Sequence, residues 1–453
     1  MATPKSVAFY TLGCKLNYSE TSSIERLFSD NGWSVSEFEQ GADIYVINTC
    51  SVTEFADQKC RQIVRRALRQ TPEALIVVIG CYAQLKPTEI ANIEGVDLVL
   101  GAAEKFRILE FIEGLSKSAG KGMIQAGEVR EAKTFHNAFS FGDRTRSFLK
   151  VQDGCDYKCS FCTIPQARGA SRSDTVENAV ANARKIAEMG VKEIVLTGVN
   201  LGDFGNGTEV IEGTRAKKEA LFIDLIQALD AVEGIDRFRI SSIEPNLLTP
   251  EIIAFVADSQ RFAPHFHVPL QSGNNKQLTQ MRRRYRRELY AERVENIKRV
   301  MPHACIGVDV IVGFPDETDA DFLETYRFIQ AMDVSYLHVF TYSERANTPA
   351  ATMPNAVPMQ KRRERNEMLR ILSEKKKRAF YEPFVGQTRP VLFENHKNPA
   401  LLTGFTDNYI KIEVPKPVDR LLVNTIEPVE LGHFTTEGDL AAQLCKAVQL
   451  ERG

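Results

Sequence analysis

Six short β-rich runs alternate with helical segments between residues 148 and 342. The runs cover residues 148–152, 193–199, 238–243, 266–270, 306–312 and 336–342, and helical patterns such as 175–189, 221–232, 288–301 and 320–332 lie between them. Strands that alternate with helices form parallel sheets, because each helix returns the chain to the same end of the sheet. Six such units predict a partial (βα)6 barrel rather than a closed eight-fold one, with its working edge at the carboxyl ends of the strands.

A shorter alternation of the same kind precedes the barrel. β-rich runs at 7–12, 44–48, 75–79 and 96–100, with a helical pattern at 55–69, predict a doubly wound α/β domain over residues 4–118. A polar connector follows at 117–133, and the barrel domain is predicted over residues 140–372, with a loop insertion at 202–218.

The end of the chain shows a third pattern. After a basic helix at 360–380, short β runs with turn residues between them cover 389–394, 400–405, 409–414 and 425–431. This spacing is typical of small all-β modules, and it predicts a small β-barrel over residues 375–440. The fold class is therefore α/β, with a β-barrel at the carboxyl end.

The composition is that of a folded protein with no membrane span. The chain has 453 residues, of which 43% are apolar and 26% charged. No run approaches the roughly 18 apolar residues that a membrane helix needs, and the first ten residues lack the segments of a signal peptide. We therefore expect a cytoplasmic protein without membrane association. The formal charge of −2 neither indicates nor excludes a nucleic-acid partner.

Three cysteines lie just after the first predicted barrel strand, at positions Cys155, Cys159 and Cys162. Thiolates at this spacing can hold one metal centre from a single loop, and thiolates are the usual ligands of iron–sulfur clusters. Zinc is the alternative, but structural zinc prefers four protein ligands and no fourth cysteine lies nearby in the sequence. A cluster with three protein ligands leaves one iron open for a cofactor or substrate.

Three further cysteines, Cys14, Cys50 and Cys81, each directly follow a predicted strand of the first domain. In an open parallel sheet such positions meet in the crevice beyond the carboxyl ends of the strands. We therefore expect these thiols to converge and to hold a second cluster. The alternative is that they pack as small apolar residues, which is the interpretation that we give to Cys60, Cys305 and Cys445.

The cysteine loop after the first barrel strand, with Phe161 directly before its last cysteine, resembles the radical S-adenosylmethionine (SAM) superfamily. The resemblance implies a six-unit barrel, and a [4Fe–4S] cluster on Cys155, Cys159 and Cys162 whose open iron binds SAM. It also places Phe161, Gly198, Ser242 and Glu244 at the cofactor. Each of the last three could instead be a strand end that requires a small or capping residue.

The order of a three-cysteine domain, a radical core and a C-terminal TRAM barrel resembles the methylthiotransferases, which carry two [4Fe–4S] clusters. The resemblance implies that Cys14, Cys50 and Cys81 hold the second, auxiliary cluster. The run Cys50-Ser51-Val52-Thr53 resembles the subgroup that converts N6-threonylcarbamoyladenosine at tRNA position 37 to its 2-methylthio derivative. Asp316 departs from the family, because glycine is usual there.

The resemblance implies tRNA and an electron donor of the reductase or flavodoxin type as partners. Two alternatives keep the same clusters and change the substrate to isopentenyladenosine tRNA or to a ribosomal protein. A third alternative is an iron–sulfur protein that serves electron transfer alone. Such a protein would require neither cofactor-binding strand ends nor an RNA-binding tail.

Local basic clusters are candidates for RNA contact, with an ordinary solvated face as the alternative. Arg282, Arg283, Arg284, Arg286 and Arg287 surround Tyr285 after a barrel strand, and a second cluster, Arg61, Arg65, Arg66 and Arg69, can share one helix face. Arg168 or Arg172 is expected to pair with the carboxylate of the threonylcarbamoyl group. In the tail, Phe393, Phe405 and Tyr409 either stack on bases or fill the core.

Overall fold

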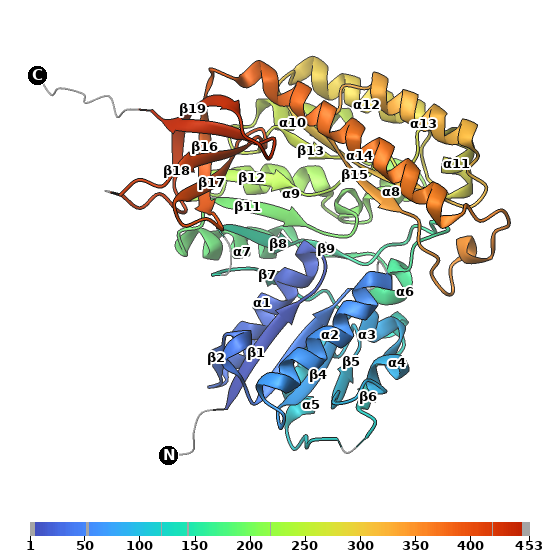
Figure 1. Cartoon of the computed structure of the whole chain (residues 1–453), viewed down its shortest axis with the longest axis vertical. Coiled ribbons are helices and arrows are strands. Elements are labelled where there is room, and N and C mark those ends of the chain that lie inside the picture. The colour runs from blue at the N-terminus through green and yellow to red at the C-terminus, as the bar shows by residue number, and fades with distance from the viewer. Residues whose placement is uncertain are drawn as a thin grey trace, which may run out of the picture.

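The computed structural model describes residues 5–50, 54–118, 120–142, 145–217, 219–418 and 420–445. An open α/β domain forms the lower part of the molecule, a larger barrel domain lies above it, and a small β-barrel packs beside the larger one (Figure 1). The three parts follow the chain order that the sequence predicts, so the predicted fold class is confirmed.

The N-terminal sheet is parallel throughout, with the strand order β2-β1-β3-β4-β5-β6. Its strands are β1 (Ser6–Thr11), β2 (Ser34–Ser36), β3 (Ile44–Thr49), β4 (Leu75–Gly80), β5 (Leu98–Leu100) and β6 (Met123–Gln125). Alternate side chains enter two different apolar cores, Ala8 on one face and Val7 on the other. The predicted end of this domain at residue 118 is too early, because β6 lies beyond it and completes the sheet.

Helices cover both faces of this sheet, as the doubly wound prediction requires. Apolar residues of α2 (Glu54–Gln70), α3 (Cys81–Leu85) and α4 (Pro87–Ala91) pack on one face, and those of α1 (Lys15–Asp30) and α5 (Ile108–Ile112) on the other. α1 also packs against the barrel domain. This helix therefore joins the two domains.

The six predicted barrel strands are all present and run in parallel. They are β8 (Arg146–Lys150), β11 (Glu193–Thr197), β12 (Arg237–Ile240), β13 (His265–His267), β14 (Cys305–Val312) and β15 (Tyr336–Thr341). A parallel bridge between Phe238 and Phe262 links the first three strands to the last three. A short antiparallel strand, β7 (Ala138–Phe139), lies at the open edge beside β8.

Helices surround this partial barrel. They are α7 (Val176–Glu188), α9 (Phe222–Asp230), α10 (Pro250–Asp258), α11 (Asn275–Gln280), α12 (Arg287–Val300), α13 (Asp319–Ala331) and α14 (Met359–Tyr381). Three short elements lie in its loops, namely α6 (Ile164–Arg168), α8 (Gly207–Ile211) and a β9–β10 pair (Gln152–Asp153 and Arg172–Ser173). The segment predicted as a loop insertion, residues 202–218, therefore contains a helical turn.

The C-terminal strands close into a five-stranded barrel, which agrees with a TRAM-like domain. They are β16 (Thr388–Asn395), β17 (Leu401–Thr406), β18 (Lys411–Pro415), β19 (Ile426–Phe434) and β20 (Leu440–Leu444). The sequence prediction missed β20. The predicted limits 375–440 are also shifted, because α14 continues to Tyr381 and the last strand ends at Leu444. Phe393 is fully buried in the barrel core.

Asp316, which stands where the family usually has glycine, adopts a left-handed backbone conformation with φ of 63°. Aspartate tolerates this conformation better than most residues with a Cβ atom. Its side chain accepts hydrogen bonds from Gln280 and Asn355 at 3.1 Å each. Asp316 therefore adopts a backbone conformation that glycine also adopts readily, and its side chain is held by hydrogen bonds. Within the described part of the chain, no helix is long and apolar enough to span a membrane.

Candidate functional site

Cys50 and Cys81 directly follow β3 and β4, and Cys14 lies three residues after the end of β1; the three strands are neighbours in the N-terminal sheet. The chain reverses direction tightly beside two of them, at Gly13 with φ of 110° and Gly80 with φ of 100°. A Cβ atom at Gly13 would lie 2.7 Å from the Cβ atom of Cys50. The three cysteines therefore lie at the same edge of the sheet, and position 13 between β1 and Cys14 has no room for a side chain. Ser51, Val52 and Thr53, which carry the subgroup resemblance, lie outside the described residues.

Cys155, Cys159 and Cys162 lie in the loop between β9 and α6. The Sγ atom of Cys155 accepts a hydrogen bond from the backbone N–H of Tyr157, and that of Cys162 accepts one from Ile164, both at 3.4 Å. Arg283 donates to the Sγ atom of Cys159 at 3.1 Å. These donors suit thiolates that bind a cluster, because hydrogen bonds to cluster sulfurs are part of how proteins hold and tune such centres.

Burial raises the pKa of each of the three thiols in this loop, that of Cys162 to about 11. A buried thiolate is costly unless positive charge compensates it, and bound iron supplies that charge. Both sites offer three cysteine sulfur atoms as ligands, and cysteine sulfur is the usual ligand of iron–sulfur clusters. Cys60 and Cys305 are buried elsewhere, Cys60 on α2 and Cys305 at the start of β14.

The four residues predicted at the cofactor lie at or near the carboxyl ends of the barrel strands. Gly198 follows β11, and a Cβ atom there would lie 2.8 Å from Leu201 and 3.0 Å from the Oε1 atom of Gln152. Ser242 follows β12 and lines the same cavity as Gly198. Phe161 is half-buried, with its ring edge toward Phe314 at 6.4 Å between centroids. Their roles at the cofactor remain predictions.

Glu244 is held by a partner. Its carboxylate forms an ion pair with Arg283, the residue that also donates to Cys159. Arg283 is almost fully buried and also donates to the hydroxyl of Tyr285 at 3.2 Å. Arg283 was predicted to bind RNA phosphate, but its guanidinium is directed into the barrel. Its neighbours Arg282 and Arg284 are exposed, and Arg284 pairs with Glu212 at 2.6 Å above the ring of Tyr157.

Arg168 and Arg172 lie in a buried charge network between the domains. Arg168 of α6 pairs with Glu20 of α1 and with Asp153 of β9, both at 3.0 Å. Arg172 pairs with Asp153 at 3.0 Å and donates to the carbonyl of Thr134 at 3.1 Å. The prediction that either arginine pairs with a substrate carboxylate is not supported by this geometry, because both already have acidic partners.

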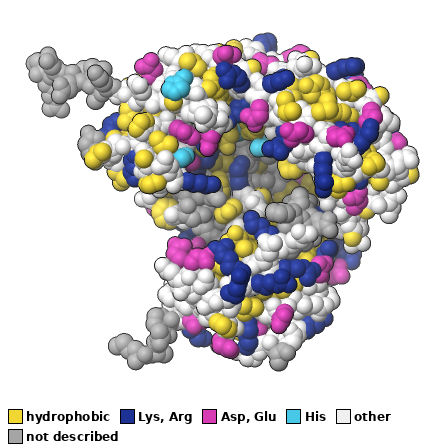
Figure 2. All heavy atoms as spheres, viewed as in Figure 1, with side chains coloured by type: hydrophobic (Ala, Val, Ile, Leu, Met, Phe, Trp, Pro, Cys, Tyr) yellow, Lys and Arg dark blue, Asp and Glu magenta, His cyan; other side chains and the backbone are white. Residues whose placement is uncertain are grey.

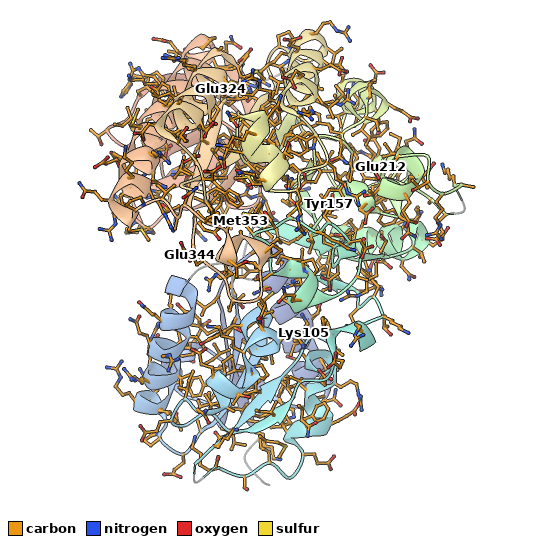
Figure 3. The ribbon with its side chains drawn as sticks, turned by 90° about the vertical axis from the view of Figure 1, so that its right-hand side faces the viewer. Lys105, Tyr157, Glu212, Glu324, Glu344 and Met353 are labelled. Carbon is orange, nitrogen blue, oxygen red and sulfur yellow. The ribbon has the colours of Figure 1, made fainter. Side chains whose placement is uncertain are left out.

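Glu20 is the centre of this network, since Lys105, Lys150 and Arg168 all pair with its carboxylate. Burial favours the neutral acid, but the three cations outweigh burial and hold the pKa of Glu20 well below its usual range. Figure 3 shows Lys105 where the N-terminal domain meets the barrel domain, with Tyr157 on the barrel side of this junction. The network therefore fixes the N-terminal cysteine site against the barrel.

A cavity of about 640 Å³ lies inside the barrel, next to the N-terminal domain. Cys14 and Lys15 line it from the N-terminal domain, Gly198 and Ser242 from the strand ends, and His267 and His338 from the barrel interior. Its size is in the range of small-molecule sites in proteins. Tyr409 of the TRAM-like barrel reaches its far end, where the ring stacks on His265 with 4.3 Å between centroids. All three domains thus contribute to one cavity.

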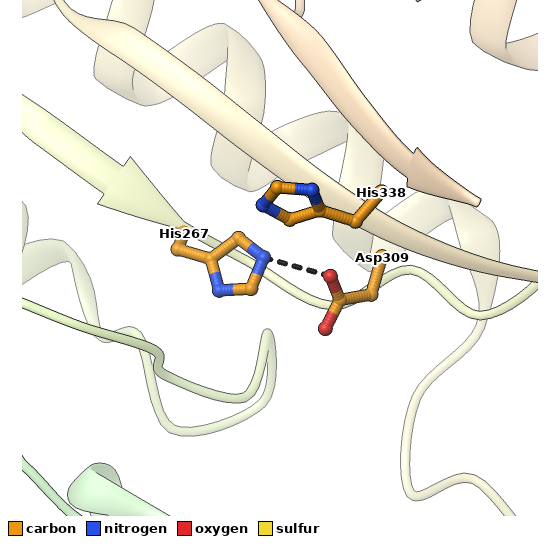
Figure 4. Close-up of side chains that lie close together, drawn as sticks. All are labelled: His267, Asp309 and His338. Carbon is orange, nitrogen blue, oxygen red and sulfur yellow. Dashed lines mark hydrogen bonds and ion pairs between the residues drawn. The ribbon is translucent and has the colours of Figure 1, made fainter. Parts of the chain in front are cut away.

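The barrel wall of this cavity carries a polar group. The Nε2 atom of His267 lies 2.9 Å from the Oδ1 atom of Asp309, and His338 lies beside them (Figure 4). Burial and the neighbouring His267 lower the pKa of His338, and burial also holds the pKa of His265 well below its usual range. The imidazole rings of His338 and His265 are therefore neutral at pH 7.

Several cavity residues were missed by the sequence prediction, among them Lys15, Arg146, Arg239, His267 and His338, and so was Asp309, which contacts His267. The missed signal was polar residues at alternate positions of barrel strands, such as His265 and His267, or Tyr336 and His338. Residues two apart in a barrel strand face the same side. Phe405 and Tyr409, predicted either to stack on bases or to fill a core, pack on each other at 4.8 Å.

Comparison with known proteins agrees with this architecture. Residues 149–329 match the radical SAM superfamily, and residues 6–101 match Uncharacterized protein family UPF0004. The chain is 40% identical over 414 residues to the threonylcarbamoyladenosine tRNA methylthiotransferase MtaB of Bacillus subtilis, covering 90% of each chain. It is 39% identical to the protein of that name from Aquifex aeolicus, covering 90% of this chain and 96% of the relative.

More distant relatives place these similarities in context. A tRNA-2-methylthio-N(6)-dimethylallyladenosine synthase of Akkermansia muciniphila is 29% identical, covering 94% of this chain and 96% of the relative. Among solved structures, the radical SAM methyltransferase TsrM of Kitasatospora setae aligns with a TM-score of 0.55 and 14% identity, covering 97% of this chain and 87% of that one. This last likeness concerns the fold alone. The chain belongs to the radical SAM methylthiotransferase family, in the group whose curated members are named threonylcarbamoyladenosine tRNA methylthiotransferases.

Proposed function

We propose that this protein replaces the C2 hydrogen of N6-threonylcarbamoyladenosine at position 37 of tRNA with a methylthio group. The observation that carries the proposal is a cavity that Cys14 of the first cysteine site lines directly and that short contacts link to the second site. Cys14 of the first site lines this cavity, and so does Ser242, two residues before Glu244, which Arg283 links to Cys159 of the second site. The relatives that are 34 to 40% identical over most of the chain bear the corresponding name.

The cofactors are those of the family, SAM and two [4Fe–4S] clusters. When bound, they supply the electron, the 5′-deoxyadenosyl radical and the methylthio group for a C–H bond that acid–base catalysis cannot activate. We assign Cys155, Cys159 and Cys162 to the cluster that binds SAM, and Cys14, Cys50 and Cys81 to the auxiliary cluster. Gly198 gives the methionyl group of SAM close access to the backbone, and Ser242 offers it a polar contact.

The protein's own residues hold the two sites in a fixed relation. The Glu20 network ties α1, which begins directly after Cys14, to α6, which follows the Cys162 loop. Both ends of this connection are buried, so the distance between the two cluster loops is set by packed side chains rather than by a flexible linker. Tyr409 and His265 stack on each other in the lining of the cavity.

We propose that tRNA binds across the exposed arginines of α2 and of the segment before α12. Figure 2 shows Lys and Arg side chains gathered over α2, facing the hollow between the lower and upper parts of the molecule. On α2, Arg65 and Arg69 line a groove with Asn92, and neither forms an ion pair with a described acidic residue. Arg61 and Arg66 of the same predicted cluster pair with Glu89 and Glu39. Arg282 extends the surface on the barrel side.

Because tRNA is its substrate, we place the protein in the cytoplasm. We also propose that an electron donor of the reductase or flavodoxin type reduces the cluster that binds SAM.

The test of the proposed function is nucleoside mass analysis of tRNA from cells with and without the gene. Loss of the 2-methylthio derivative of threonylcarbamoyladenosine, with retention of unmethylthiolated threonylcarbamoyladenosine, is expected. Loss of the isopentenyladenosine derivative instead, or of a methylthio group on a ribosomal protein, would contradict the proposal.

A further inference from the structure

We infer that the ammonium group of Lys15 binds the carboxylate of the substrate's threonylcarbamoyl group, and so selects this nucleoside. The inference rests on the proposed function and adds to it a residue that recognises the substrate. A buried carboxylate requires a cationic or hydrogen-bonding partner, because leaving it unpaired in a desolvated site is costly. The partner of this carboxylate must therefore be a cation at the cavity that has no acidic partner of its own.

Lys15 is the first residue of α1 and directly follows Cys14. Its side chain lines the barrel cavity, where its charged neighbours are Arg146 of β8, Arg239 of β12 and Asp309 of β14. No hydrogen bond or ion pair engages the Lys15 ammonium group anywhere in the described part of the chain. It is thus a cation that faces the cavity with its donors available.

The other cations at the cavity are already engaged. Arg146 donates to Glu394 at 2.8 Å and packs over the ring of Phe405, and Arg239 donates to Glu193 at 2.9 Å and packs over Tyr409. The contacts with Glu394, Phe405 and Tyr409 join the barrel domain to the TRAM-like domain. The contact with Glu193 joins two neighbouring barrel strands. Both arginines raise the positive potential around Lys15 without being free to move, which favours an anionic ligand over a neutral one.

Asp309 is the acidic side chain that acts on Lys15, and it contacts His267 at 2.9 Å. The cavity therefore holds one positive charge, that of Lys15, for which no acidic side chain is available as a partner. An entering carboxylate would correct this imbalance by pairing with Lys15. A neutral isopentenyl group would leave Lys15 desolvated and unpaired, so the same residue also disfavours the alternative substrate.

The position of Lys15 suits the chemistry. C2 and C6, the carbon that carries the N6 substituent, are the two ring atoms bonded to N1, and C2 must face the sulfur donor at the Cys14 site. The N6 substituent therefore extends from a position close to C2, within the region that a side chain one residue after Cys14 can serve. Arg168 and Arg172, which the sequence analysis predicted for this role, are paired with acidic residues in the buried network.

The test uses the reconstituted enzyme and two synthetic anticodon stem-loop RNAs that differ at one group. In one RNA the threonylcarbamoyl group ends in its free carboxylate, and in the other it ends in the primary amide. RNA affinity is measured without reductant, and methylthio product and 5′-deoxyadenosine are measured with it. We compare the parent enzyme with Lys15→Met, Lys15→Arg and the control Lys192→Met, which lies outside the cavity and pairs with Asp236 at 3.3 Å.

The parent enzyme and the control are expected to prefer the carboxylate RNA over the amide RNA on the order of 10- to 100-fold in Kd and KM, the range typical of a charge-assisted contact. Lys15→Met should lose that preference by weakening only the carboxylate RNA, and Lys15→Arg should keep part of it. Lys192→Met should keep the parent iron content and the parent rate of uncoupled 5′-deoxyadenosine formation, and iron content is measured in both Lys15 variants to establish that their clusters are loaded.

Two results would overturn the inference while the proposed function stands. One is a parent enzyme that binds and modifies both RNAs equally, a measurement that requires no variant to fold. The other is a Lys15→Met enzyme that keeps the full preference for the carboxylate. Failure of the parent enzyme to modify either RNA, while it still forms 5′-deoxyadenosine, would instead contradict the proposed function.

Discussion

Glu20 of α1 and Arg168 of α6 form a two-pronged ion pair, with N–O distances of 3.0 and 3.2 Å, in which neither side chain has appreciable exposure to solvent. The two residues are 148 positions apart in the chain. One belongs to the helix that begins directly after Cys14, and the other to the helix that follows the Cys162 loop. The pair therefore connects the surroundings of the two cysteine sites.

Replacement of Glu20 by alanine is expected to destabilise the protein by about 3 to 5 kcal/mol, because it leaves Lys105, Lys150 and Arg168 buried without their shared carboxylate. Urea unfolding of the apoprotein at pH 7 measures this change in the free energy of unfolding. The exposed Glu73→Ala variant is the control and should unfold like the parent. Equal stability of both variants would contradict the account of the network.

The stabilising effect of Glu20 should depend on pH in a definite direction. Its pKa is depressed in the folded state, so its contribution is fully present above the unfolded-state value of about 4 and is lost as the pH falls toward the folded-state value. The difference in unfolding free energy between the parent and Glu20→Gln should thus be constant from pH 7 to about pH 5 and decrease below about pH 4. A difference that grows as the pH falls would show the opposite linkage.

Changing Cys14, Cys50 and Cys81 together to alanine should remove methylthio product but leave cleavage of SAM intact. About half of the iron of the reconstituted enzyme should remain, since one of two four-iron clusters is lost. Anaerobic assays of 5′-deoxyadenosine and of modified nucleoside separate the two activities. The buried Cys60→Ala is a matched control and should keep both. Product formation by the triple variant would mean that these thiols only pack.

Single changes of Cys155, Cys159 or Cys162 to alanine should have the complementary effect. Each is expected to abolish 5′-deoxyadenosine formation, while the auxiliary cluster and about half of the iron stay bound. Iron analysis and the same cleavage assay measure the result, with Cys305→Ala as the buried control. A variant that cleaves SAM at the parent rate would remove that cysteine from the set of ligands.

Changing Arg65 and Arg69 to glutamine should weaken tRNA binding to a similar degree for all tRNA sequences and reduce the salt dependence of binding by about two phosphate contacts. Filter binding or fluorescence anisotropy over a range of salt concentrations measures both effects. Arg184→Gln, an exposed change on α7, should leave the affinity unaltered. If the double variant binds with the parent affinity and salt slope, the α2 surface does not contact tRNA.

The sequence alone determined the order of the domains, the six barrel strands and the grouping of the cysteines. Each of these features depends on local pattern, because strand and helix periods and the spacing Cys155, Cys159, Cys162 are properties of short segments. Convergence of Cys14, Cys50 and Cys81 also followed, since parallel neighbouring strands end at one edge of a sheet. Short strands were missed, namely β6 at the edge of the N-terminal sheet and β20 in the closed barrel, because a few residues carry little periodic signal.

The tertiary structure alone decided what each charged residue pairs with. In the sequence, Arg168, Arg172 and Lys15 are alike, as basic residues near cysteine motifs, and Arg283 is one member of an arginine cluster. Whether a cation is available to a ligand depends on which carboxylate lies within about 4 Å of it, and that carboxylate can be far away in the chain, as Glu20 is from Arg168. Burial in one network occupied the predicted arginines, and the shape of the barrel cavity left Lys15 as a cation with its donors available, a relation that no local pattern contains.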